Sequence, residues 1–252
     1  MKNRIVVFLL CALALIALPL VAQQFGQGWV RILAIALLYV LLALGLNIVV
    51  GYAGLLDLGF VAFYAVGAYM YALLASPHLA ENFEWFAQMF PNGLHTPIWV
   101  VVPLAALLAG IAGVLLGTPV LKLRGDYLAI VTLGFGEIIR VFMNNLEHPV
   151  NITNGPRGLD RIDAMNIFGF SFGKAVEIGG YRISSVVLYY YLFLLLVVFS
   201  VIICHRLETS RIGRAWMAIR EDEIAAKAMG INTRNMKLLA FGMGATFGGC
   251  RA

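Results

Sequence analysis

Charged residues are scarce in this chain. Only 12% of its 252 residues are Asp, Glu, Lys or Arg, whereas 62% are hydrophobic. A soluble domain carries roughly twice that charged fraction. A soluble core of this size cannot hide so much apolar surface from water, but a bilayer can. The composition therefore excludes an ordinary soluble protein and predicts an integral membrane protein.

The sequence also lacks the patterns of a disulfide framework, a metal site or a catalytic site. Cys11, Cys204 and Cys250 are odd in number and lie in or beside apolar runs, so we expect packing residues. The four histidines show no metal-ligand spacing. No HExxH, GxSxG or complete phosphate-binding loop occurs in a supporting context, so neither catalysis nor a cofactor is predicted.

Long apolar runs dominate what is present, and they predict an all-α, polytopic membrane protein. About six runs are long enough to cross a bilayer at about 20 residues per span. A seventh starts at Leu238 and is cut off at Ala252, too early to cross the bilayer, which predicts a single membrane domain, 1–252, that is incomplete at its C-terminus. Small residues in the fourth run, Gly110, Gly113 and Gly117, predict close approach of another helix. The runs cover 5–22, 32–50, 60–75, 98–121, 127–143 and 183–204.

Two alternatives remain open at the start of the chain. The first run, behind Lys2 and Arg4, is long enough to be a retained span. It also fits a cleaved signal peptide with a small-residue site at Ala22. The sequence favours the span, since a multi-span chain can use its first helix as the export signal.

The distribution of basic residues predicts the orientation. With the N-terminus in the cytoplasm, the inside segments 1–4, 122–124 and 205–237 hold eleven of the 18 Lys and Arg, and the outside segments hold five. This excess on the inside follows the positive-inside rule. The net charge of +5 is thus explained by topology, and no nucleic-acid partner is expected.

A glycine-rich stretch interrupts the apolar pattern after the second run. It contains the candidate residues of a translocation path, which are Asn47, Gly51, Gly54, Asp57 and Gly59. Transporters often bind substrate at interrupted helices, where freed backbone groups are available. A tight turn between two ordinary spans explains the glycines equally well.

Two opposite charges lie within the fifth run. Glu137 and Arg140 are three residues apart, so they share a helix face and can pair. Because the pair satisfies both charges, a structural ion pair is favoured over a substrate contact.

The segment 205–237 contains a short helix between two apolar runs. Asp222 is a suitable N-cap and Gly230 a suitable C-terminal stop, with Thr233 capping the helix that follows. The small apolar face formed by Ile224, Ala225 and Ala228 fits a protein partner. A solvated linker helix is the alternative.

Four long stretches, in order, resemble the M-type permease subunit of the high-affinity branched-chain amino acid ABC importers. They are GLLDLGFVAFYAVGAY (54–69), LRGDYLAIVTLGFGEIIR (123–140), TNGPRGL (153–159) and GRAWMAIREDEIAAKAMG (213–230). The resemblance implies a subunit of the bacterial inner membrane, without ATPase activity of its own. Its implied partners are a second permease subunit, two ATP-binding subunits and a periplasmic solute-binding protein.

The stretch from Glu223 to Gly230 is similar to the "EAA" loop of importer permeases. This similarity implies that the segment 205–237 couples to the ATPase through six residues: Glu223, Ile224, Ala225, Ala226, Ala228 and Gly230. The family default substrates are leucine, isoleucine and valine, whereas close relatives carry urea, short amides or other amino acids. A stand-alone secondary transporter, with Asp57 as its ion-coupling carboxylate, remains the less favoured alternative.

Overall fold

The computed structural model describes residues 2–90, 94, 96–121, 123, 125–147, 151–159, 161–167, 170–173, 175–178 and 181–249. It contains two compact units. One comprises residues 1–41 and 164–202, and the other comprises residues 42–163 and 203–252. The single permease domain expected for 1–252 remains a prediction.

The chain is a polytopic α-helical membrane protein. Among the described residues, three helices are long and apolar enough to cross a membrane, and they match the second, fourth and sixth predicted runs. These are α2 (Gln27–Asn47) with its π-helical continuation η1 (Ile48–Tyr52), α6 (Ile98–Val120) and α8 (Ser185–Thr209). The remaining runs form α1 (Lys2–Gln24), α3 (Val61–Leu74), α7 (Asp126–Asn145) and α11 (Thr233–Gly249). The number of complete spans stays a prediction.

In the first unit, α1 and the first part of α2 pack with α8. Val30 and Ala34 of α2 are buried against Val187 and Tyr190 of α8. The same unit holds two short antiparallel strand pairs, β1 (Asn166–Ile167) with β2 (Phe170–Ser171) and β3 (Val176–Ile178) with β4 (Tyr181–Ile183). These strands lie between the fifth and sixth predicted apolar runs, except that Ile183 of β4 belongs to the sixth run.

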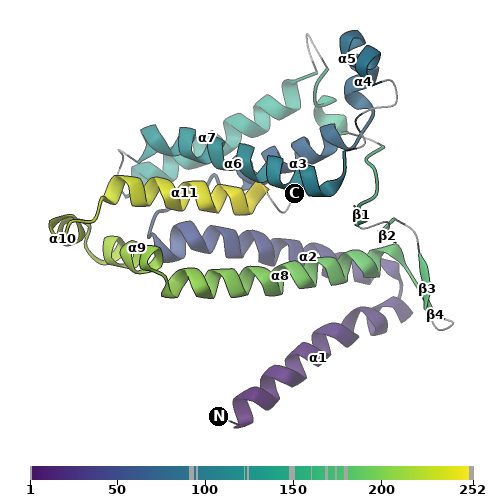
Figure 1. Cartoon of the computed structure of the whole chain (residues 1–252), viewed down its shortest axis with the longest axis horizontal. Helices are drawn as coiled ribbons and strands as arrows, with labels where there is room; N and C mark the ends of the chain where they lie inside the picture. Colours follow the sequence, from purple (N-terminus) through teal and green to yellow (C-terminus); the bar gives the residue numbers. More distant parts are fainter. Residues whose placement is uncertain are drawn as a thin grey trace. The chain divides into compact units, whose positions relative to one another are not determined.

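In the second unit, α11 lies along α6 and α3 (Figure 1). The predicted close approach to α6 is confirmed, and α11 is the partner. A Cβ atom at Gly110 would lie 2.6 Å from Thr246 Cγ2, and one at Gly113 would lie 3.1 Å from the Phe241 carbonyl oxygen. Only glycine therefore fits at these two positions of α6 without displacing α11.

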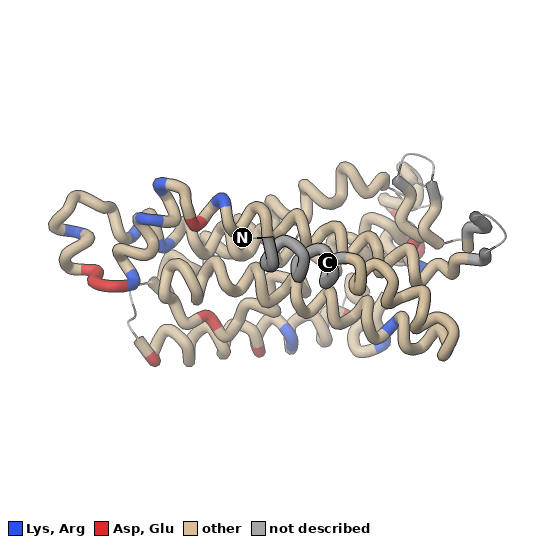
Figure 2. Tube along the Cα trace, turned by 90° about the horizontal axis from the view of Figure 1, so that it is seen from below, with Lys and Arg blue, Asp and Glu red and all other residues tan. Residues whose placement is uncertain are grey.

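Shorter elements complete the second unit. The segment 76–96, between the third and fourth predicted apolar runs, contains α4 (His78–Asn82) and α5 (Glu84–Met89). A 3₁₀ turn, η2 (Gly155–Arg157), follows α7, and α9 (Arg211–Glu221) and α10 (Glu223–Ala228) connect α8 to α11. The long helices are almost free of charge, and basic residues gather around α9 and α10 (Figure 2).

Candidate functional site

The helix that begins at Gln27 is interrupted before α3. It continues through Ile48–Tyr52 as the π-helix η1, and residues 53–60 are irregular. The backbone N–H of Leu55 bonds the Val49 carbonyl at 3.1 Å, which bridges six residues. Since π-helical turns are rare and are often found at functional sites, the interruption is a candidate site.

Three candidate path residues shape this interruption. The side chain of Asn47 occupies the space that a Cβ atom at Gly51 would need. Gly54 has a φ of +68°, which a side chain rarely adopts, whereas Gly51 and Gly59 have no positive φ. The stretch therefore combines an interrupted helix with one glycine turn, the two alternatives that the sequence left open.

Asp57 is buried in this interruption and is only partly satisfied. It is 2% exposed, and its Oδ1 accepts a 2.9 Å hydrogen bond from the Gly59 N–H. Its Oδ2 has no hydrogen-bond partner among the described residues. The carboxylate borders a small apolar cavity between α3, α6, α7 and α11. The cavity volume is about 10 Å³, the size of a site for one water molecule. An unpaired buried carboxylate oxygen is costly, which marks Asp57 as a candidate functional residue.

The irregular segment 53–60 is hydrogen-bonded to α7 and packs closely against it. The Thr132 hydroxyl accepts from the Leu58 N–H and donates to the Ala129 carbonyl, both at 3.0 Å. A Cβ atom at Gly136 would lie 3.3 Å from the Cα of Gly59, so glycines on both sides allow the contact. Sequence reasoning missed Thr132, whose only signal was a polar residue within an apolar run.

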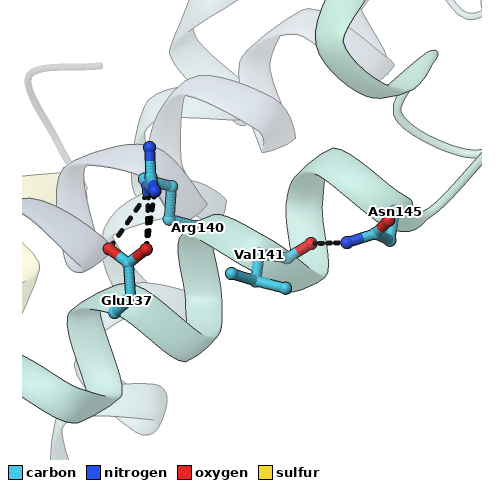
Figure 3. Close-up of polar contacts among 4 residues, drawn as sticks. All are labelled: Glu137, Arg140, Val141 and Asn145. Atoms are coloured by element: carbon cyan, nitrogen blue, oxygen red, sulfur yellow. Dashed lines mark hydrogen bonds and ion pairs between the residues drawn. The ribbon is translucent and has the colours of Figure 1, made fainter.

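Glu137 and Arg140 form the expected ion pair on α7 (Figure 3). Arg140 Nη2 lies 2.6 Å from Glu137 Oε1, and Arg140 Nε donates to both carboxylate oxygens at 3.0 and 3.1 Å. The side chains are 58% exposed at Glu137 and 70% exposed at Arg140. Pairing is thus confirmed, but the pair lies on the surface of the chain.

The short helix α10 is built as the sequence predicts. The Asp222 carboxylate caps it by accepting from the N–H groups of Ile224 and Ala225 at 2.8 and 3.1 Å. Gly230 follows with a φ of +84°. Ile224 is 79% exposed and Met229 is 84% exposed, which leaves an apolar face uncovered within this chain.

The structure corrects one expectation about the segment 205–237, the cap of α11, whereas the coupling roles of Glu223 and Ala226 stay predictions. Ala226 is 4% exposed and packs within the chain, so it does not lie on the open face. Glu223 is joined to Lys237 of α11 by a 2.7 Å ion pair. The N-cap of α11 is Asn232, whose Oδ1 accepts from the Asn235 N–H, and Thr233 is the first helical residue.

Sequence reasoning missed two residues that hold α9 in place. The fully buried Trp216 donates its indole N–H to the Met236 carbonyl at 2.8 Å and so fixes α9 to α11. Arg220 donates to the carbonyl of Gly51 in η1 at 2.6 Å, and its side chain packs on Gly54. The segment 205–237 is therefore bonded directly to the interruption. Gly51 and Arg220 are 169 residues apart, and no sequence signal connects them.

Acidic, histidine and cysteine side chains do not gather into a metal-sized cluster in the part of the chain that the structure describes. The thiol of Cys204 is buried in the core of the second unit, as expected of a packing residue. The side chains of Cys11 and Cys250 lie outside the described residues.

The chain is similar to known permeases over most of its length. Residues 28–251 match the family described as "Branched-chain amino acid transport system / permease component". The high-affinity branched-chain amino acid transport system permease proteins LivM of Escherichia coli (strain K12) and Salmonella typhimurium (strain LT2) are 43% and 42% identical over 237 residues. These alignments cover 89% of this chain and 51% of each relative, so the chain spans about half the length of the curated relatives it matches. No solved structure matches the chain.

Proposed function

Since this chain belongs to the branched-chain amino acid transport system permease family, we propose that it is a transmembrane subunit of an ATP-driven importer. It forms part of the translocation path for leucine, isoleucine and valine by alternating access. Its partners are a second permease subunit, two cytoplasmic ATP-binding subunits and a periplasmic solute-binding protein. The names of the two LivM relatives support this substrate class.

The observation that carries the proposal is the exposed apolar face of α10. Ile224 and Met229 are almost fully solvent-exposed within this chain, and Ala225 and Ala228 are exposed beside them. Large exposed side chains on a capped helix fit a groove on a partner protein better than they fit water. Glu223 then acts as an internal tie to Lys237, and Gly230 ends the helix.

The orientation belongs to the same proposal. The N-terminus and the segment 205–237 lie in the cytoplasm, and the segment 76–96 lies outside, as the basic residues require. In this orientation α10 faces the compartment that contains ATP. The whole of 1–252 then acts as one permease domain, in which 205–237 is the coupling segment.

A secondary transporter is the second candidate, and the buried, partly unpaired carboxylate of Asp57 favours it. A polar group of this kind at membrane depth often marks a proton or ion pathway. Such a transporter would need an ion gradient and no ATPase. Within the importer, Asp57, Asn47, Gly51, Gly54 and Gly59 serve as candidates for the path itself.

The experiment that separates the two candidates uses the tagged chain expressed with its importer subunits. We expect an ATP-binding subunit to copurify, and leucine uptake into proteoliposomes to require both ATP and the solute-binding protein. Ala225→Glu places a charge on the exposed face of α10, so it should abolish copurification. Uptake driven by an ion gradient without ATP, and unaffected by Ala225→Glu, would establish the secondary transporter instead.

A further inference from the structure

A groove between α3 and α7 contains the ion pair. It is open on one side and has a volume of about 290 Å³, close to the lower end of the range of about 300–1,000 Å³ typical of small-molecule sites. Its walls are mainly aliphatic, from Leu58 and Val61 on one side and Leu133 and Ile139 on the other. Glu137 and Arg140 lie on the α7 wall, side by side on one face of the helix (Figure 3).

The exposure of this pair conflicts with a lipid-facing position. Glu137 is eleven residues from the start of α7, the fifth predicted span, and lies about 17 Å along a helix that is about 30 Å long. Charges at such depth face a protein interior or an aqueous cavity, because hydrocarbon cannot solvate them. This groove therefore faces water or a partner subunit in the membrane.

We propose that this groove binds the zwitterionic head of an aliphatic amino acid, with Arg140 on the carboxylate and Glu137 on the ammonium group. The inference rests on the proposed import function, to which it adds a substrate site. The aliphatic walls from Leu58, Val61 and Leu133 then receive the side chain of the substrate.

The ion pair can accept such a ligand without breaking. Arg140 uses Nε and Nη2 on Glu137, and its Nη1 makes no hydrogen bond in the described part of the chain. The outer edge formed by Nη1 and Nη2 fits a carboxylate with two parallel bonds. The carboxylate oxygens of Glu137 keep lone pairs free for an ammonium donor. Ligand and pair then form an alternating arrangement of four charges.

Cysteine labelling in the assembled importer tests whether the groove is a wet substrate site. Leu133→Cys lies on the groove wall and is 56% exposed, whereas Ile138→Cys lies outside the groove and is 62% exposed. With a charged, membrane-impermeant thiol reagent, we expect position 133 to react and position 138 to be inert. Leucine should slow the reaction at position 133 several-fold. No reaction at position 133, or a rate that leucine leaves unchanged, would overturn the proposal.

Charge reversal separates substrate binding from a structural role. The double variant Glu137→Arg/Arg140→Glu keeps an ion pair at the same spacing but reverses the charges offered to the zwitterion. We expect normal amounts of complex, retained ATP hydrolysis, and leucine uptake at least tenfold lower, since each lost charged hydrogen bond weakens binding by about tenfold or more. Wild-type uptake in the double variant would refute the site.

If the double variant does not assemble, the labelling of Leu133→Cys decides whether the groove binds leucine. Failure of wild-type protein to import leucine would refute the proposed function, while the labelling results would still report on the groove.

Discussion

The hydroxyl of Tyr190 donates a 2.9 Å hydrogen bond to the carbonyl of Leu15. Leu15 is four residues before Pro19, which lies inside α1 and has no N–H to bond that carbonyl. A helix in lipid must satisfy its backbone groups internally or through neighbouring helices. Tyr190 of α8 therefore supplies the donor that the sequence of α1 lacks.

This relationship predicts a coupled pair of substitutions. Tyr190→Phe should lower the free energy of unfolding by about 1 kcal/mol, because it leaves the Leu15 carbonyl unpaired. In a Pro19→Ala background, where residue 19 regains its N–H, the same change should cost less. Thermal unfolding of the four combinations measures the coupling. Tyr191→Phe is the control, since its hydroxyl bonds the Ile16 carbonyl at 2.9 Å and does not depend on Pro19. Equal costs in both backgrounds would refute the compensation.

The role of Gly230 in ending α10 can be tested with substitutions that differ only in the backbone conformation they allow. Gly230 has a φ of +84° and open space around the position of a Cβ atom. Gly230→Val should therefore strain the backbone by about 1–3 kcal/mol, whereas Gly230→Asn should be tolerated because Asn adopts left-handed conformations. We expect leucine uptake and substrate-stimulated ATP hydrolysis to fall together in the Val variant only. Docking of the loaded solute-binding protein should be unchanged in both variants. Wild-type uptake by the Val variant would contradict a coupling role for α10.

The hydrogen bond from Arg220 to Gly51 predicts a loss of coupling between ATP hydrolysis and transport. Arg220→Met keeps an unbranched chain against Gly54 but removes a charged donor, a change of about 1.5–3 kcal/mol for the interruption. We expect fewer leucine molecules transported per ATP hydrolysed, with the ATPase still bound. Arg214→Met is the matched control on α9, because within the described part of the chain the Arg214 side chain bonds the nearby Thr209 carbonyl alone. Identical stoichiometry in the two variants would show that Arg220 is merely structural.

The loop after α7 is predicted to stabilise the end of that helix. The hydroxyl of Thr153, which is buried, donates to the Met143 carbonyl at 2.6 Å. Thr153→Val should destabilise the protein by about 1–2 kcal/mol, whereas Thr153→Ser keeps the donor and should cost less. Thermal unfolding of the purified complex compares the two. If Val and Ser are equally stable, the hydroxyl contributes nothing.

The orientation is predicted to place α10 and the segment 76–96 on opposite sides of the membrane. An alkaline phosphatase reporter, active only outside, should be inactive when fused after Lys227 and active when inserted within 76–96. A green fluorescent reporter should give the reverse result. Activity of the phosphatase after Lys227 would invert the whole topology.

Local features of the fold were accessible from the sequence. The pairing of Glu137 with Arg140 and the capping of α10 by Asp222 depend only on neighbouring residues, so helical spacing predicts them. The cap of α11 was misplaced by one residue, because Asn232 and Thr233 are both good caps and their order alone does not decide between them.

Features that depend on distant contacts were not accessible. Glycines on α6 predicted a close neighbour, but a sequence cannot say that Phe241 and Thr246 of α11 would fill the space. The bond between Arg220 and Gly51 and the burial of Ala226 likewise arise only when segments far apart meet. Exposure of the Glu137–Arg140 pair was missed for the same reason, since spacing fixes the pair but not what covers it.

The contact between α6 and α11 has a mechanical consequence. Where Gly113 faces Ala245 and the Phe241 carbonyl, backbone lies against backbone, and there is no rotamer to change. Close-packed contacts of this kind are stiff, because compressing or shearing them produces steric overlap at once. We therefore expect a displacement of α10, which is tied to α11 through Glu223 and Lys237, to be passed on to α6. We expect α6 and α11 to move together as one rigid unit.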